Sequence, residues 1–178
     1  MLHKTILSGT LFGLTISRIC QELIENHQDF ENSVLLGLQP RGTFFANRIH
    51  QELLAVTGKN IQIGTLDATF YRDDYRRRDM LSPNTTKIPF LIESKKVILI
   101  DDVLATGRMV RAALDAMTAF GRPEKIELCV MIDRMHNRDI PIKADYFGKK
   151  VITIDSEKVL VEWTEQGHNE DKIVLITE

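Results

Sequence analysis

The chain lacks several features that mark whole classes of protein. It has only two cysteines, Cys20 and Cys129, each in an apolar stretch, which argues against a disulfide framework and favours reduced thiols in a cytoplasmic protein. No apolar run approaches the roughly 20 residues of a membrane-spanning helix, so no membrane partner is expected. The formal net charge of −2 offers no general basic field for nucleic acid. There is no internal repeat and no low-complexity segment.

The composition that remains is that of a globular protein. The 178 residues are 43% hydrophobic and 27% charged. This length suits one domain with a sizeable core, and we expect residues 1–178 to form a single unit.

Predicted helices and strands alternate along the chain. The first helix is expected to run from an N-cap at Ser8 to about Asn26, with Leu11 and Leu14 on its apolar face. Two more helices are expected, one ending near Leu54 and one at 110–119. Besides the stretch that starts at Val97, strands are expected at 33–38, 61–70, 88–92, 126–132, 151–154, 159–163 and 173–176. This alternation predicts an α/β fold with a mostly parallel sheet flanked by helices.

The most informative stretch is Val97-Ile98-Leu99-Ile100-Asp101-Asp102-Val103-Leu104-Ala105-Thr106-Gly107-Arg108. A buried strand here delivers Asp101 and Asp102 to the carboxyl edge of the sheet, where α/β folds bind ligands. The turn at Thr106 and Gly107 presents amides at a helix N-terminus, which suits a phosphate. Carboxylates beside a phosphate site favour a ligand with hydroxyls or a bound cation, such as a phosphorylated sugar. The alternatives are an Asp pair that caps the helix, and a magnesium site of the receiver-domain kind.

This stretch resembles the phosphoribosyl-pyrophosphate (PRPP) motif of the type I phosphoribosyltransferases. The resemblance implies that Asp101 and Asp102 hold the ribose hydroxyls. It also implies that a loop wraps the 5′-phosphate, comprising Val103, Leu104, Ala105, Thr106, Gly107, Arg108 and Met109. The family usually has Ser or Thr at the position of Met109, so a side-chain donor is lost and weaker PRPP affinity is expected.

A second turn between a strand and a helix, Gln39-Pro40-Arg41-Gly42, carries chemistry of the same kind. Glycine permits close approach to an anion, and Arg41 can fork onto phosphate oxygens. Taken alone, this is an ordinary turn with a solvated arginine. Its place in the chain resembles the pyrophosphate loop of the same family, which implies that Pro40, Arg41 and Gly42 contact PRPP. The sequence leaves the Gln39–Pro40 isomer open.

Two further segments resemble the lid and hood of these enzymes. The polar connection 72–86 suits a flexible hairpin lid over pyrophosphate, with Arg72 as the preferred contact. The region 133–160 resembles a small C-terminal hood, which implies base contacts by Lys143, Asp145 and Tyr146. By themselves, Tyr146 fits a core position and Lys143 a solvated one.

In combination, the motifs resemble the family of bifunctional pyrimidine-operon regulators and uracil phosphoribosyltransferases, the PyrR-like proteins. The resemblance implies transfer of phosphoribosyl from PRPP to uracil, giving UMP and pyrophosphate with Mg²⁺. The metal would arrive with PRPP, Asp101 being the candidate protein ligand. Asp101, Asp102 and Arg41 are the expected catalytic group. Purine-using relatives carry an acid where this chain has Ala105, which favours uracil over a purine substrate.

The resemblance also implies a homodimer or homotetramer and contacts to pyrimidine leader RNA. Arg18 and His136 keep RNA-contacting positions. Gln21 stands where a histidine is usual and Asp155 where a lysine is usual, and an acid repels RNA. We therefore expect an enzyme first and an RNA-binding attenuation regulator second, with a purine phosphoribosyltransferase as the third alternative.

Overall fold

A computed structural model describes residues 2–73, 83–136 and 138–177. Its helices are α1 (Gly9–His27), α2 (Gly42–Thr57) and α3 (Arg108–Met117), with short 3₁₀ turns at Thr69–Tyr71, Thr118–Phe120 and Thr164–Gln166. Its strands are β1 (Leu2–Ser8), β2 (Ser33–Leu38), β3 (Ile63–Leu66), β4 (Lys96–Leu104), β5 (Lys125–Met135), β6 (Tyr146–Ile152), β7 (Glu157–Glu162) and β8 (Lys172–Thr177).

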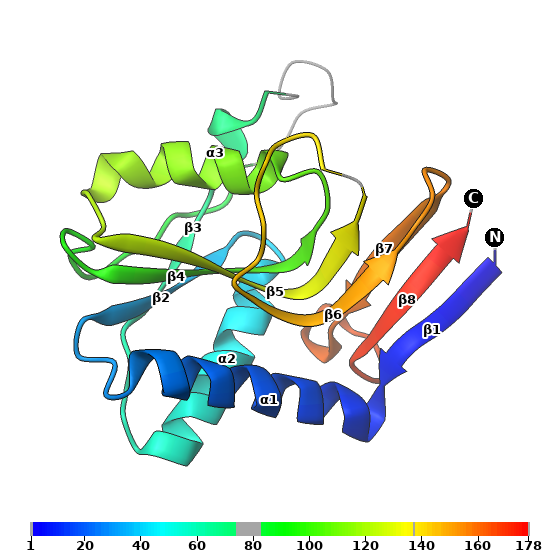
Figure 1. The fold of residues 1–178 in the computed structure, drawn as a ribbon, viewed down its shortest axis with the longest axis horizontal. Coiled ribbons are helices and arrows are strands. Elements are labelled where there is room, and N and C mark those ends of the chain that lie inside the picture. The colour runs from blue at the N-terminus through cyan, green and yellow to red at the C-terminus, as the bar shows by residue number, and fades with distance from the viewer. Residues whose placement is uncertain (1, 74–82, 137, 178) are drawn as a thin grey trace.

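Five strands form a wholly parallel sheet in the order β3-β2-β4-β5-β6. Helix α3 covers one face of this sheet, and α1 and α2 cover the other (Figure 1). Because both faces are covered, the central strands are apolar runs without alternation. Every residue of β2 is buried, and so is β4 from Val97 to Asp102. The predicted α/β fold with a parallel sheet flanked by helices is confirmed.

A second, antiparallel sheet has the order β1-β8-β7 and lies beside the end of β6 (Figure 1). Both sheets share one hydrophobic core cluster, in which Trp163 stacks on Phe45 of α2 and meets Phe12 of α1 edge-on. The sequence pattern did not predict β1, the strand that pairs the N-terminus with β8. The predicted hood, residues 133–160, contains the end of β5, all of β6 and the start of β7. Strands β1 and β8 complete the antiparallel sheet to which β7 belongs.

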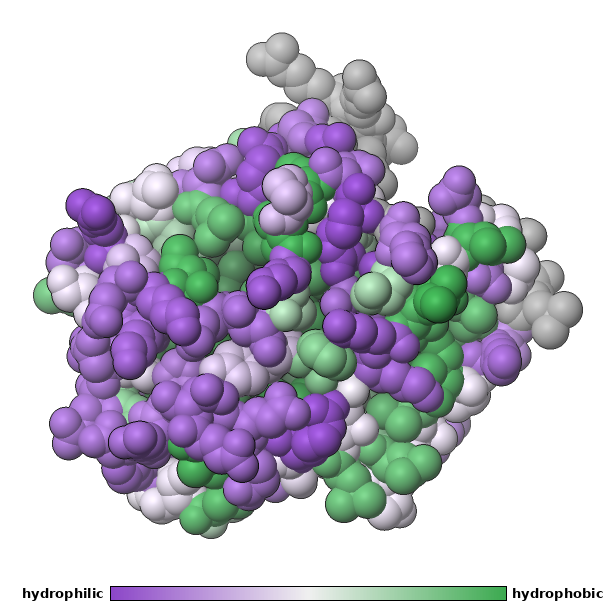
Figure 2. All heavy atoms as spheres, viewed as in Figure 1, coloured by the Kyte–Doolittle hydropathy of each residue, from purple (hydrophilic) through white to green (hydrophobic). Residues whose placement is uncertain are grey.

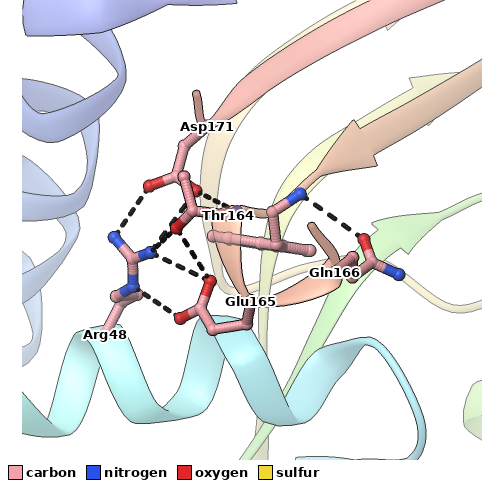
Figure 3. A network of polar contacts seen from close by, with 6 residues as sticks. Arg48, Thr164, Glu165, Gln166 and Asp171 are labelled. Atoms are coloured by element: carbon pink, nitrogen blue, oxygen red, sulfur yellow. Dashed lines mark hydrogen bonds and ion pairs between the residues drawn. The ribbon is translucent and has the colours of Figure 1, made fainter. Parts of the chain in front are cut away.

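A network around Arg48 connects the antiparallel sheet to α2 (Figure 3). The Arg48 guanidinium pairs with Glu165 at 2.9 Å and with Asp171 at 2.8 Å, and it donates to the Thr164 hydroxyl at 2.9 Å. The Glu165 hydrogen bond is the main reason that the Arg48 pKa is raised. The carboxylates follow β7 and precede β8, so one side chain joins the turn between these strands to the helix.

Four local predictions were wrong. The strand predicted at 151–154 overlaps only the end of β6, which begins at Tyr146 and ends at Ile152. Residues 88–92 form no strand: Lys87 makes a single antiparallel bridge with Thr65, and Pro89 lacks the amide that a ladder needs. The strand predicted at 61–70 is only Ile63–Leu66. On α1, Leu11 and Leu14 are 63% and 58% exposed, because Phe12, Ile16, Ile19 and Leu23 form the buried face.

Exposed apolar residues lie on several parts of the surface, among them the start of α1, the end of α2 and the start of β5. In Figure 2, hydrophobic residues gather at the lower right, where β1, β8 and the start of α1 meet. Hydrophilic residues cover most of the rest of that view (Figure 2). Among the described residues, no helix has both the length and the apolar character to cross a membrane.

Candidate active site

Strand β4 places two adjacent carboxylates at the carboxyl edge of the parallel sheet. Asp101 and Asp102 are only 8% and 7% exposed. The Asp102 amide donates to Oδ1 of Asp101 at 2.8 Å, which fixes the first side chain. Both residues belong to the β4 run that the apolar pattern predicted, and their burial comes from that central place in the sheet.

Burial sets the protonation chemistry of this pair. The pKa of Asp101 is raised well above its ordinary value, first by desolvation and then by the negative charge of Asp102. The pKa of Asp102 is also raised by burial, and the Arg41 guanidinium opposes the rise. Among the described residues, Oδ2 of Asp102 and Nε of Arg41 are buried without a hydrogen-bond partner. The pair therefore favours a ligand that brings hydroxyl donors or positive charge.

Arg41 comes to this pair from the turn between β2 and α2. Its Nε lies 3.4 Å from Oδ2 of Asp102, and its Nη2 donates to the Val161 carbonyl of β7 at 2.9 Å. The bond between Gln39 and Pro40 is cis. The Pro40 carbonyl accepts a hydrogen bond from the Thr43 hydroxyl at 2.6 Å. Arg41 thus sits between the carboxylates and the antiparallel sheet.

Gly42 is needed for the packing of α2 against β4. A Cβ on Gly42 would lie 2.5 Å from the Ile100 carbonyl oxygen and 2.9 Å from Cα of Asp101. Any other residue would push the first turn of α2 away from the carboxylate. The sequence motif predicted close backbone approach to a ligand here, and the structure also shows backbone packed against backbone.

The loop after β4 joins the carboxylates to the N-terminus of α3. Gly107 has φ +86°, a left-handed conformation that glycine adopts without strain, and it precedes the first helical residue, Arg108. Val103 is half-buried and Leu104 is buried. Met109 packs against the core cluster beneath α3, so the residue that replaces Ser or Thr serves the interior. The loop has the left-handed turn and helix N-terminus that a phosphate site requires.

Arg72 and Arg108 lie near the stem of the segment predicted to be a lid. Arg108 pairs with Asp139 at 2.8 Å and with Asp73 at 2.5 Å. Arg72 follows the 3₁₀ turn Thr69–Tyr71 and is half-buried. Most of the predicted lid, residues 74–82, lies outside the described residues.

The predicted base contacts are not brought to the carboxylate pair. Oδ2 of Asp145 accepts from the Leu128 amide at 2.8 Å, and the hydroxyl of Tyr146 faces His27, 3.4 Å away. His27 ends α1 near the amino ends of the strands, which is the opposite edge of the sheet. Lys143 lines a surface pocket of about 520 Å³ between α3 and the start of β5, together with Lys125. The structure gives these three side chains other surroundings, and base binding by them stays a prediction.

The predicted RNA contacts have other partners or stand at a strand end. The Arg18 guanidinium donates to the carbonyls of Phe147 and Gly148 at 2.9 and 2.7 Å, and it pairs with Glu22. His136 lies just beyond β5 with φ +69° and is exposed.

The residue that sequence reasoning missed is Arg138. Its guanidinium contacts the Asp133 carboxylate and the carbonyls of Leu104 and Ala105, where β4 ends and the following loop begins. Arg138 lies in an irregular segment without periodicity, so no pattern distinguished it from a solvated arginine. The nearest signal was the polar Asp133 at the end of a buried strand.

Among the described residues, no group of three or more His, Cys, Asp and Glu side chains is arranged to hold a metal ion. Two adjacent carboxylates with an orphaned buried oxygen nevertheless fit Mg²⁺, which prefers oxygen ligands and often shares them with substrate phosphates. Two carboxylates suit a Mg²⁺ ion that is brought by a bound phosphate compound better than one held by the protein alone.

Comparison with known proteins agrees with this geometry. The family model described as "Phosphoribosyl transferase domain" matches residues 3–166. The Bifunctional protein PyrR of Listeria welshimeri is 43% identical over 164 residues, covering 90% of this chain and 89% of that protein. The protein of the same name from Streptococcus mutans is 39% identical over 178 residues, covering 100% and 98%.

The fold is also found in solved structures. An HGPRT-ase from Leishmania tarentolae in complex with GMP has a TM-score of 0.72 at 13% identity and covers 96% of this chain and 94% of its own. At that identity the likeness concerns the fold alone. The family match and the extent of the similarity to PyrR proteins together show that the chain belongs to the phosphoribosyltransferase family and, within it, to the PyrR-like proteins.

Proposed function

We propose that this protein transfers the phosphoribosyl group from PRPP to uracil, giving UMP and pyrophosphate. The observation that carries the proposal is the buried pair Asp101 and Asp102 next to the phosphate loop and within reach of Arg41. The similarity to proteins named Bifunctional protein PyrR supports the same reaction class.

Each group has a defined task in this reaction. Asp101 and Asp102 accept hydrogen bonds from the ribose hydroxyls and, as anions, stabilise positive charge at C1′ as the bond to pyrophosphate breaks. The amides of residues 105–107, at the N-terminus of α3, bind the 5′-phosphate. Arg41 faces the developing charge of the leaving pyrophosphate. Mg²⁺ bound with PRPP would be held at Asp101 or Asp102 and would neutralise charge on the pyrophosphate oxygens.

Uracil is the proposed acceptor because no acid follows Leu104. Ala105 occupies the position where purine-using relatives carry a carboxylate, and its carbonyl is held by Arg138. A purine ring nitrogen would therefore lack a proton partner from this position. A pyrimidine can be held by backbone groups alone.

The test is a comparison of initial rates with PRPP, Mg²⁺ and uracil, hypoxanthine or guanine. Uracil should be the preferred substrate, and Asp101→Ala combined with Asp102→Ala should abolish turnover. Asp115→Ala is the matched control, since Asp115 is an exposed carboxylate on α3 whose only described partner is Arg111. Preference for a purine, or full activity in the double variant, would refute the proposal.

Attenuation by leader RNA is the second candidate. The PyrR relatives are named bifunctional, which favours a second activity. The guanidinium of Arg18 is engaged by backbone carbonyls, however, and is only partly available to a phosphate. We rank RNA binding below catalysis. We also propose a homodimer or homotetramer, which light scattering of the purified protein tests directly.

A further inference from the structure

The Arg138 guanidinium is hydrogen-bonded through all three of its nitrogens. The side chain is 22% exposed, and Asp133, which it pairs with, is 7% exposed. Nε donates to the Ile142 carbonyl at 2.9 Å. Nη1 donates to the carbonyls of Leu104 at 3.3 Å, of Arg134 at 3.0 Å and of Ala105, and Nη2 donates to the Asp133 carboxylate. One side chain thus joins the end of β5, the segment after it and the loop after β4.

The remaining carbonyls of that loop also turn into the protein. The Thr106 carbonyl accepts from the amides of Asp139 and Ile140 at 3.0 and 3.2 Å, and the Gly107 carbonyl accepts from the Arg111 amide at 3.0 Å. All four carbonyls from 104 to 107 therefore have donors within the protein, three of them from Arg138 and the segment after β5 and the fourth from the first turn of α3. Among the described residues, the amides of 105, 106 and 107 have no hydrogen-bond acceptor. In Figure 1 the segment after β5 runs beside the loop after β4.

We propose that Arg138 is a positioning residue for the 5′-phosphate of PRPP. By holding the carbonyls of Leu104 and Ala105 on the inner side, it leaves the loop amides directed outward, and its positive charge lies behind the anion site. A carbonyl turned toward the phosphate would repel it, because both carry negative charge. Arg138 acts through the loop and does not touch the substrate. This inference rests on the proposed function, since it concerns how the same site holds PRPP.

The experiment compares the wild type with Arg138→Ala, Arg138→Lys and the control Arg122→Ala, in which an exposed arginine beyond α3 is removed. In Arg138→Ala the KM for PRPP should rise about tenfold to a hundredfold, in line with the cost of a misplaced binding group. The KM for uracil at saturating PRPP should stay within about twofold, because only phosphate binding is affected. Arg138→Lys should restore little of the affinity for PRPP, because one ammonium group cannot make the several hydrogen bonds of a guanidinium. Arg122→Ala should behave as the wild type.

Chemical rescue separates positioning from a general structural role. Guanidinium chloride at low millimolar concentration should lower the KM for PRPP of Arg138→Ala, whereas potassium chloride at equal ionic strength should not. Since Arg138→Ala leaves the buried Asp133 carboxylate without its partner, the variant can misfold. The double variant Arg138→Ala with Asp133→Asn removes that charge and keeps the test valid.

Calorimetry with PRPP and Mg²⁺ distinguishes the two proposals. If the wild type binds no PRPP, the proposed function fails and this inference fails with it. If the wild type binds PRPP and a folded Arg138 variant binds it with unchanged affinity, only the role of Arg138 is overturned. Equal loss of uracil and PRPP binding, without rescue by guanidinium, would also overturn it.

Discussion

Asp101 carries a charge that the folded protein accommodates poorly until a ligand binds. Its pKa is raised, chiefly by burial and next by Asp102, so the folded state holds the proton to higher pH than the unfolded chain does. Stability contributed by the protonated form is present at low pH and is lost as pH rises toward the folded pKa. The carboxylate is therefore maintained for ligand binding at a cost in stability.

Asp101→Asn should stabilise the protein and inactivate it. The amide keeps an oxygen for the Asp102 amide and removes the buried charge, so we expect a gain of about 1 kcal/mol in the free energy of unfolding at pH 8. The gain should shrink toward pH 4, where the wild-type carboxyl is protonated. Turnover should fall by about a hundredfold or more. Denaturant titrations at several pH values measure the free energy of unfolding of both proteins. An Asp101→Asn variant less stable than the wild type at pH 8 would contradict the prediction.

His27 gives a pH dependence of the opposite sign. It lies 2.8 Å from Glu127 and 2.8 Å from the Ser33 hydroxyl, and burial, the largest effect, lowers its pKa against the opposing influence of Glu127. Below about pH 6.5, the ordinary histidine pKa, the unfolded chain binds a proton that the folded protein excludes. Stability is therefore lost as pH falls through this value.

His27→Gln should remove that dependence. Between pH 7.5 and 5, the stability advantage of the wild type over His27→Gln should decrease, by at most about 1.4 kcal/mol per pH unit. Urea unfolding at fixed ionic strength measures the difference. An advantage that stays constant over this range would show that His27 has no linked proton.

At the scale of elements, the contact between α2 and β4 leaves no room for a side chain at Gly42. Gly42→Ala should cost about 1–3 kcal/mol, since its Cβ meets the backbone of Ile100 and Asp101 and neither can move cheaply. It should also raise the KM for PRPP, because Asp101 is displaced.

Gly13→Ala is the matched control in α1. Nothing lies within 4 Å of its Cβ position, and it is exposed in the second turn of α1, so alanine should stabilise by about 0.5–1 kcal/mol without changing activity. Thermal unfolding of both variants tests the pair. Equal effects of the two substitutions would contradict the packing argument for Gly42.

Elements with strong local signals were predictable and the others were not. The strands at 33–38 and 126–132 are mainly apolar runs, and the structure has both, buried at 33–38 and at 127–132. The strand β1 exists only because β8, more than 160 residues away in sequence, offers a pairing edge, and no local pattern encodes that. Leu11 was misplaced because several rotations of an apolar stripe fit α1, and only packing against β6 and α2 selects one.

The candidate site divides in the same way. Asp101, Asp102 and Gly107 lie in a contiguous motif, so their proximity follows from the chain itself. Arg41 required the topology of adjacent parallel strands, which the alternating pattern supplied. Arg138 reaches its partners from an irregular segment, and its role depends on carbonyl directions that a sequence does not show.

At the scale of the whole molecule, the balance of charge argues against strong nucleic-acid binding. The net charge is −2, and Arg18 is engaged internally. A gel shift with the native pyrimidine leader transcript should give a dissociation constant in the non-specific range of about 10⁻⁴–10⁻⁶ M at physiological salt. Nanomolar binding with a steep salt dependence, weakened by Arg18→Ala, would instead promote the regulatory function.

The Arg41 side chain contacts both sheets, through the Asp102 carboxylate of β4 and the Val161 carbonyl of β7. The same guanidinium neutralises Asp102 and ties the Val161 carbonyl of β7, so the two contacts are thermodynamically linked. A bound polyanion that draws this cation toward itself must loosen the tether to β7. Conversely, a distortion of β7 must alter the proton affinity of Asp102. Occupancy of the sugar site and the docking of β7, which Arg41 contacts 120 residues downstream, are consequently linked through this one side chain.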